Sequence, residues 1–222
     1  MILTLQRRPE RSQWMSVLSP LLAVTLTAIV GAIIFAAQGI HPGRALYVYF
    51  IDPLTTSWSI EELAVKSSPL ILIGVGLAVC FKAKVWNIGA EGQLTAGALA
   101  GAAVPILLPT FQSPPVLAVM IVLAVTGGAL YGAIPALLKT RFGANEILTS
   151  LMLVYVAQLL LDWLVRGPWR DPNGFNFPQS AAFEGWQVLP HLGDGRLHLG
   201  IVFALVAAMV LSVVMDRTLK GF

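Results

Sequence analysis

The sequence has little charge and almost no cysteine. Only 11% of its 222 residues are charged and 57% are hydrophobic, with a mean hydropathy of +0.79, whereas soluble domains carry about 25% charged residues. This composition excludes an ordinary soluble globular protein, and it equally excludes a disordered chain, which needs low hydrophobicity and high charge. The one cysteine, Cys80, lies inside an apolar run, so a disulfide scaffold is excluded as well.

Catalytic and metal-binding motifs are missing too. The sequence contains no G-x-x-x-x-G-K-[ST] phosphate loop, no H-E-x-x-H and no G-x-S-x-G element. Three histidines, His41, His191 and His198, are a weak signal for a metal site. The net charge of +3 comes from Lys and Arg scattered between apolar stretches, which argues against a nucleic-acid partner. We therefore expect no enzyme, no cofactor and no metal, and any ATP hydrolysis in a separate subunit.

Long apolar runs are what the sequence has in abundance. About 20 apolar residues in a helix span a bilayer, and six windows approach that length: residues 15–37, 67–81, 87–108, 115–138, 147–165 and 199–215. The second window is short, and Pro69 is expected in the first turn of its helix. The windows predict an all-α fold, a polytopic transmembrane helical bundle with about six spans, in which residues 1–222 form a single transmembrane domain.

The positions of Lys and Arg predict how the spans are oriented. Positive residues are retained on the cytoplasmic side, and a cytoplasmic N-terminus places nine of the fourteen inside: Arg7, Arg8, Arg11, Lys82, Lys84, Lys139, Arg141, Arg217 and Lys220. The outer segments hold the other five, although they are longer: Arg44, Lys66, Arg166, Arg170 and Arg196. Two long outer connections, 41–66 and 166–198, are expected to form loops with short surface helices.

Polar residues gather at the start of two windows. The stretch 87–93, N-I-G-A-E-G-Q, carries Asn87, Glu91 and Gln93 beside two glycines. One interpretation is a helix start at the inner surface, with Asn87 as N-cap and Glu91 favoured by the helix dipole. The other is a discontinuous span whose polar side chains line a translocation pathway. Asn145 and Glu146 allow the same two interpretations, a capped helix start or a pathway lining.

Glycines at helical spacing mark a different feature of the spans. Gly97 and Gly101 lie four residues apart in the third window, and Gly128 and Gly132 do so in the fourth. Such pairs let two membrane helices approach closely. They therefore predict helix packing within the bundle, and a substrate pathway between close backbones is the alternative.

The same motifs resemble those of a known family, the permease subunits of bacterial ABC importers for simple sugars and nucleosides, in particular the branch paired with nucleoside-binding lipoproteins. The resemblance covers nearly the whole chain after residue 60. It is carried by S-P-L-I-L at 68–72, by F-K-A-K-V-W at 81–86 leading into N-I-G-A-E-G-Q, and by L-K-T-R-F-G-A-N-E at 138–146. One departure is Val154, which stands where the family's M-L-N-Y-I-A element usually has Asn.

The resemblance implies an importer in the bacterial plasma membrane. In this scheme two permease subunits, identical or paralogous, form the pathway. Two cytoplasmic ATP-binding subunits drive transport, and a periplasmic or lipoprotein substrate-binding protein delivers the solute. It favours nucleosides over free sugars, although the residues themselves do not separate the two. Family members usually continue past Phe222 through the loop that contacts the ATPase, so we expect a permease truncated at its C-terminus, with its coupling residues further on.

Two alternatives to a permease subunit follow from the residues alone. The first is an ion-coupled secondary carrier or channel in which Glu91 titrates within the membrane. The second is a membrane scaffold with no transport role, which the missing catalytic motifs allow.

Overall fold

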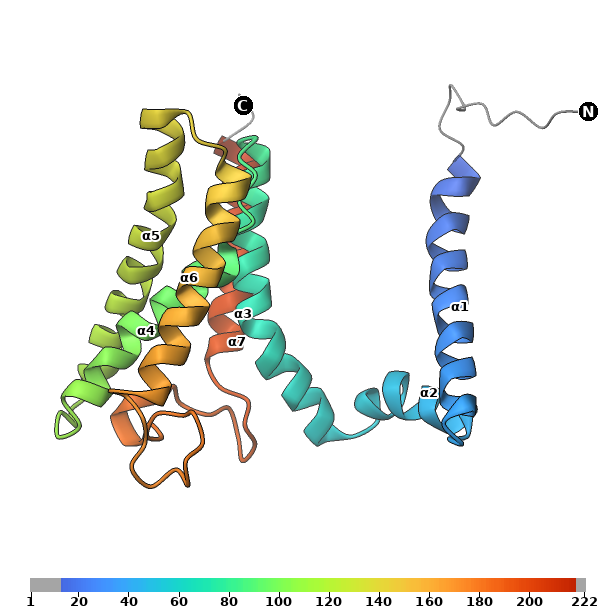
Figure 1. Cartoon of the computed structure of the whole chain (residues 1–222), viewed down its shortest axis with the longest axis horizontal. Helices are drawn as coiled ribbons and strands as arrows, with labels where there is room; N and C mark the ends of the chain where they lie inside the picture. The colour runs from blue at the N-terminus through green and yellow to red at the C-terminus, as the bar shows by residue number, and fades with distance from the viewer. Residues whose placement is uncertain (1–12, 219–222) are drawn as a thin grey trace, which may run out of the picture. The chain divides into compact units, whose positions relative to one another are not determined.

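The structure is a computed structural model in which residues 13–218 are described, and its ordered elements are helices (Figure 1). In chain order they are α1 (Gln13–Ala37), α2 (Pro42–Phe50), η1 (Asp52–Leu54), α3 (Ser57–Lys82), α4 (Ala90–Leu107), α5 (Val116–Phe142), α6 (Glu146–Arg166), η2 (Gly185–Gln187) and α7 (Gly200–Thr218). The prediction of an all-α, polytopic helical protein is confirmed. Four of the positive residues used for the orientation, Arg7, Arg8, Arg11 and Lys220, lie outside the described residues.

Each of the six predicted windows forms a helix. In the described part of the chain four helices, α1, α3, α5 and α6, are long and apolar enough to cross a membrane. The remaining two helices of the six, α4 and α7, are not among these four. Helix α4 has 18 residues, or about 27 Å at 1.5 Å per residue. The apolar part of α7 is Gly200–Met215. Most apolar side chains along the helices are exposed, which is the arrangement that a lipid environment requires.

Helix α3, which corresponds to the second apolar window, differs from its prediction. The sequence predicts a short helix with Pro69 in its first turn, and this is wrong, because α3 begins at Ser57 and Pro69 lies in its interior. The outer connection that begins at residue 41 therefore ends before Ser57, and Lys66 is helical. No helix-breaking residue separates Ser57 from Pro69, and the hydroxyls of Ser67 and Ser68 both donate to the Ala64 carbonyl at 2.9 Å. Membrane helices tolerate an internal proline where neighbouring groups compensate for its missing N–H.

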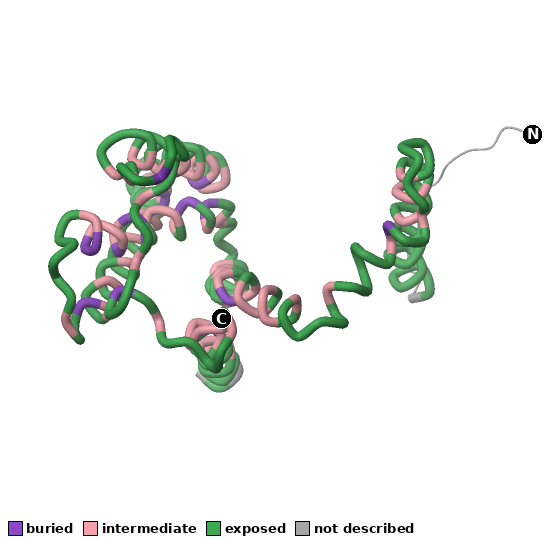
Figure 2. Tube along the Cα trace, turned by 90° about the horizontal axis from the view of Figure 1, so that it is seen from below, coloured by how far each residue is buried: buried purple, intermediate pink, exposed green. Residues whose placement is uncertain are grey.

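The chain divides into two compact units, residues 1–63 and 64–222. In the first unit α1 packs against α2, where the rings of Phe35 and Tyr49 lie 5.9 Å apart between centroids. In the second unit α4 packs along α5 and against α6, and most of the unit's buried residues belong to these three helices. Figure 2 shows how few residues along the chain are buried. The core of the second unit is thus a three-helix contact.

The link between α3 and α4 is the part of the second unit that positions the polar residues. Residues 83–89 are not helical, and Figure 1 shows them running back alongside α3 from its end at Lys82. The Ile88 amide meets the hydroxyl of Ser150, which is four residues, or about 6 Å, into α6. The segment therefore carries the start of α4 inside the bundle rather than leaving it level with the helix ends.

Candidate functional site

A cavity of about 330 Å³ lies where α3, the 83–89 segment, α4, α5 and α6 meet. Three of the five residues predicted as pathway candidates line it: Asn87, Gln93 and Glu146. The remaining lining residues are Cys80, Val85, Gly132, Pro135, Ala136, Lys139, Thr140 and Ser150. The tertiary structure thus brings the two polar motifs, which are more than fifty residues apart in the sequence, to one site.

Two of the lining residues, Asn87 and Gln93, pair with each other through their side-chain amides. Asn87 Nδ2 donates to Gln93 Oε1, and Gln93 Nε2 donates to Asn87 Oδ1, both at 3.3 Å. Asn87 Oδ1 also accepts the backbone N–H of Gly89 at 2.9 Å. The interpretation of Asn87 as N-cap is nevertheless wrong, because residues 85–89 are not helical and α4 begins at Ala90 with Gly89 as its N-cap.

The glycines of the N-I-G-A-E-G-Q motif let α4 approach α6. A Cβ atom built on Gly89 would lie 2.9 Å from Cβ of Ser150, and one built on Gly92 would lie 2.9 Å from Cα of Val154. Real Cβ atoms essentially never come so close to a neighbour, and the Val154 atom belongs to the backbone, which cannot swing away. The motif therefore requires glycine at both positions for steric reasons.

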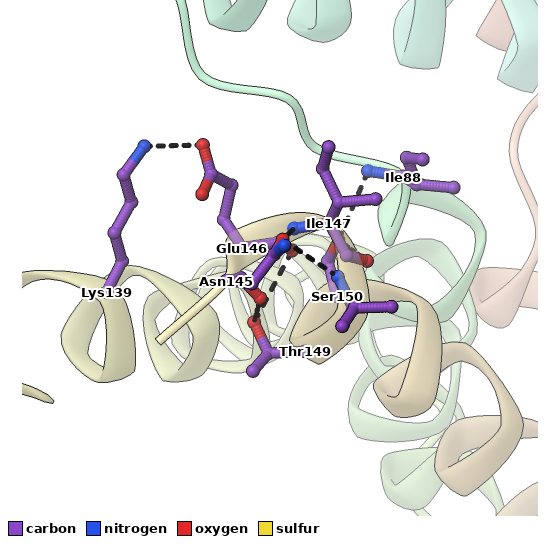
Figure 3. A network of polar contacts seen from close by, with 8 residues as sticks. Ile88, Lys139, Asn145, Glu146, Ile147, Thr149 and Ser150 are labelled. Carbon is purple, nitrogen blue, oxygen red and sulfur yellow. Dashed lines mark hydrogen bonds and ion pairs between the residues drawn. The ribbon is translucent and has the colours of Figure 1, made fainter. Parts of the chain in front are cut away.

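Ser150 anchors the non-helical segment to α6. It is buried, its hydroxyl accepts the backbone N–H of Ile88 at 3.2 Å, and the same hydroxyl donates to the Ile147 carbonyl at 3.2 Å (Figure 3). Sequence reasoning missed this residue. The available signal was a small hydroxyl residue one turn after a helix start, which local patterns do not distinguish from an ordinary helix surface residue.

Two further lining residues, Lys139 and Glu146, form an ion pair. Lys139 Nζ lies 2.5 Å from Glu146 Oε1, with side chains 39% and 19% exposed (Figure 3). The turn between α5 and α6 brings the two residues together, because Gly143, the C-cap that follows α5, adopts the left-handed conformation with φ of 64°. Lys139 was not among the predicted pathway residues, and its pairing with Glu146 across this turn depends on the tertiary structure.

Asn145 acts within its own helix. Its side-chain oxygen accepts the backbone N–H groups of Ile147 at 2.9 Å and Leu148 at 3.4 Å, so Asn145 is the N-cap of α6, as the capping interpretation predicts. It is not one of the residues that line the cavity. Glu146 follows it in the first turn, where the helix dipole favours a carboxylate.

Glu91 lies apart from the other candidates. It is in the first turn of α4, as predicted, but its side chain is exposed and does not line the cavity. Its carboxylate accepts a hydrogen bond from Gln158 Nε2 of α6 at 3.2 Å. Gln158 is a further polar residue that sequence reasoning missed, and the signal was an amide in the middle of an apolar window.

The four predicted packing glycines lie at the contact between α4 and α5. A Cβ atom on Gly97 would lie 2.7 Å from the carbonyl oxygen of Ala124, and one on Gly101 would lie 3.0 Å from that of Met120. On α5, a Cβ atom on Gly128 would lie 3.1 Å from the carbonyl oxygen of Gln93. A Cβ atom on Gly132 would lie 3.2 Å from Cδ of the Gln93 side chain, so Gly132 makes room for the amide in the cavity.

The two neighbouring histidines of the outer connection form an isolated antiparallel bridge between His191 and His198. His191 Nδ1 lies 3.1 Å from the Gly195 carbonyl, and His198 Nδ1 accepts the Gly200 N–H at 3.0 Å. Within residues 13–218 no group of three or more His, Cys, Asp or Glu side chains is arranged to hold a metal ion.

Comparison with known families decides what kind of protein carries this cavity. The family described as branched-chain amino acid transport system / permease component matches residues 59–222. The chain belongs to this permease family. No solved structure matches the chain.

Three curated relatives of the chain are permease proteins of ABC transporters. A glucose ABC transporter permease protein of Haloferax volcanii is 38% identical over 98% of the chain and 60% of the relative. A guanosine ABC transporter permease protein of Bacillus subtilis is 29% identical, and a nucleoside ABC transporter permease protein of Lactococcus lactis is 25% identical, over 92% and 93% of the chain and 59% of each relative. The chain thus spans about 60% of the length of these curated relatives.

Proposed function

We propose that this protein is the permease subunit of an ABC importer and forms the translocation pathway for a sugar or a nucleoside. The observation that carries the proposal is the cavity that gathers Asn87, Gln93 and Glu146 from two separate motifs. Polar groups within a membrane bundle are costly, so they are retained where they face water or a solute. Family membership and the sugar and nucleoside permeases among the relatives support the same assignment.

In this proposal the amide pair is the group that meets the solute. Each of its two hydrogen bonds is 3.3 Å long, beyond the usual 2.7–3.2 Å for N–H···O bonds. A passing hydroxyl group of a sugar or ribose replaces such a long bond at little cost, because each amide offers both donors and an acceptor. Glu146 and Lys139 then supply a charged section of the same pathway, next to the turn between α5 and α6.

The partners and the location follow from the same proposal. The short connections rich in Lys and Arg support a cytoplasmic N-terminus and a cytoplasmic turn after α5. We assign the protein to the plasma membrane of a bacterium. Cytoplasmic ATP-binding subunits supply the energy, a second permease subunit completes the pathway, and an external binding protein delivers the solute. The protein itself then has no catalytic role.

Uptake in the native cells tests the proposal. Uptake of labelled glucose and of labelled guanosine is measured with and without the gene, with the gene restored on a plasmid, and after ATP depletion. We expect ATP-dependent uptake of one of the two to disappear on deletion and to return on restoration. Unchanged uptake of both solutes contradicts the sugar or nucleoside assignment.

The same assay separates an ABC importer from an ion-coupled carrier with Glu91 as its titrating group. An uncoupler is added while the cellular ATP level is held constant. Uptake that persists agrees with an ATP-driven permease. Uptake that collapses under these conditions contradicts the ATP-driven mechanism and favours the carrier.

A further inference from the structure

A second cavity of the second unit lies between the helices α4 and α5 and the connection between α6 and α7. Its volume is about 330 Å³, within the range of about 300–1,000 Å³ that small-molecule sites occupy. Figure 1 shows this connection at the end of the unit opposite to the turn between α5 and α6. Apolar residues such as Leu117, Met120 and Phe183 make up most of the lining. The cavity is therefore separate from the one that holds Asn87 and Gln93.

Gln187 presents an unpaired donor to this cavity. The residue is only 7% exposed, although it lines the cavity. Its Oε1 accepts the backbone N–H of Glu184 at 3.4 Å, whereas its amide nitrogen forms no hydrogen bond with any part of the chain that the structure describes. A buried donor without an acceptor is costly. The cavity is the space from which a ligand supplies that acceptor.

Two histidine rings add one acceptor and one donor to the same lining. His191 Nδ1 lies 3.1 Å from the Gly195 carbonyl oxygen, so Nδ1 carries the proton and Nε2 of the neutral ring is an acceptor. His198 Nδ1 accepts the Gly200 N–H at 3.0 Å, so its proton is on Nε2, which is a donor. A metal ion needs an unprotonated nitrogen from each ring, and this tautomer pattern therefore favours a hydrogen-bonding ligand over a metal.

The lining selects an uncharged ligand with flat apolar faces. None of the described residues that line the cavity is Asp, Glu, Lys or Arg, so a charged ligand would find no counter-charge there. A sugar carries hydroxyl groups around its whole ring, and a mostly apolar lining would leave many of them without partners. A nucleobase instead has two apolar faces and concentrates its donors and acceptors on its edge. Phe183 is a residue of the kind on which bases stack.

We propose that this cavity, which we call the His191 pocket, binds the base of a nucleoside. The amide nitrogen of Gln187 and Nε2 of His198 donate to acceptors on the edge of the base, and Nε2 of His191 accepts one of its N–H groups. Guanine carries both kinds of group, with acceptors at O6 and N7 and a donor at its exocyclic amine. The three polar side chains thereby read the base, and the apolar lining covers its faces.

The position of the His191 pocket deepens the proposed function and rests on it for this step alone. Helices α4 and α5 line both cavities. Gly101 in the pocket follows Gln93 in the other cavity by eight residues, or about 12 Å along α4. A nucleoside held in the pocket is thus one short step from the amide pair, and the pocket acts as a selective waiting site ahead of it.

Photolabelling of the full chain in native membranes tests the pocket. Membranes of native cells that carry the chain with an affinity tag are illuminated in the presence of 8-azidoguanosine. The chain is then purified, and the labelled peptides are located by mass spectrometry. We expect label in residues 183–198 or in the parts of α4 and α5 that line the pocket. An excess of guanosine is expected to prevent the labelling, and the same excess of glucose is expected to leave it unchanged.

Two variants remove polar groups of the pocket. Gln187→Leu keeps the bulk of the side chain without its donor and is expected to lower the labelling about tenfold. His191→Phe keeps a ring without the acceptor and is expected to do the same, so it replaces Gln187→Leu if that variant does not reach the membrane. The matched control is Gln179→Leu, the same exchange at an exposed residue of the same connection outside the pocket, which is expected to label like the parent. Membrane amounts are compared by immunoblot.

Several results would overturn the inference. These are no label in the pocket of the parent chain, prevention by glucose as strong as that by guanosine, and unchanged labelling of the inserted variants. The uptake assay separates this failure from that of the proposed function. If the pocket is labelled but deletion of the gene leaves the uptake of guanosine and glucose unchanged, the pocket stands and the proposed function fails. If ATP-dependent uptake requires the gene but the pocket is not labelled, the function stands and the pocket fails.

Discussion

The side-chain amides of Asn87 and Gln93 form a closed pair in which each amide nitrogen lies 3.3 Å from the other residue's oxygen. The pair joins the end of the 83–89 segment to the first turn of α4. Gly132 of α5 leaves the space that the Gln93 amide occupies. It therefore connects the backbone path of the segment with the polar lining of the cavity.

Gln93→Leu is predicted to abolish uptake while the protein still reaches the membrane. Leucine has similar bulk but no donor or acceptor, so the Asn87 amide loses its partner and the cavity loses an amide. The loss is measured as the initial rate of solute uptake, with the membrane amount of the variant followed by immunoblot. Gln93→Asn, which keeps an amide, is the control and is expected to retain part of the activity. Normal uptake by Gln93→Leu would show that this side chain has no role in the pathway.

The ion pair between Lys139 and Glu146 is predicted to matter for transport more than for stability. Both side chains are partly exposed, and such pairs contribute only about 0–1 kcal/mol to folding. Glu146→Lys is expected to lower the initial uptake rate about tenfold, which corresponds to a barrier about 1.4 kcal/mol higher, because two like charges then share the cavity lining. The combined exchange Lys139→Glu with Glu146→Lys should recover much of the rate. Equal loss in the single and the combined variants would refute a role for the pair itself.

Gly97→Ala and Gly74→Ala are predicted to change stability in opposite directions. A Cβ atom at Gly97 would lie 2.7 Å from the Ala124 carbonyl oxygen, whereas a Cβ atom at Gly74 of α3 has nothing within 4 Å. The first substitution overpacks a helix contact, at about 1–3 kcal/mol, and the second gains the helix propensity of alanine, about 1 kcal/mol at most. Unfolding midpoints of the purified protein in detergent measure both effects. A loss of stability at Gly74 equal to that at Gly97 would contradict the packing explanation.

Asn145→Ala is predicted to lower stability through the lost cap of α6. The substitution leaves the N–H groups of Ile147 and Leu148 without their side-chain acceptor, and lost N-caps cost about 0.5–2 kcal/mol. Asn145→Ser restores a capping oxygen, so its unfolding midpoint and its uptake rate are both expected to stay near those of the parent. An Asn145→Ser variant that is stable but inactive would instead assign Asn145 to the pathway.

The helices and their approximate ends were predictable because their signals are local. Apolar length predicted six helices, and Asn145 followed by Glu146 predicted where α6 begins. Helix α3 is longer than the sequence predicts, because Pro69 resembles the start of a helix although membrane helices tolerate proline inside. The polar cavity itself was only partly predictable: its motifs were visible in the sequence, but Lys139 and Ser150 joined the site through contacts between helices.

The sequence by itself determined that this is a polytopic helical membrane protein with polar motifs at two helix starts. Composition and apolar length suffice for that, because they decide whether water or lipid surrounds each segment. Only the tertiary structure decided that Gln93 points into the cavity and Glu91 onto an exposed face. The two residues are two positions apart, or about 200° around a helix, and in lipid both sides of a helix are apolar, so hydropathy does not tell which side meets a neighbour.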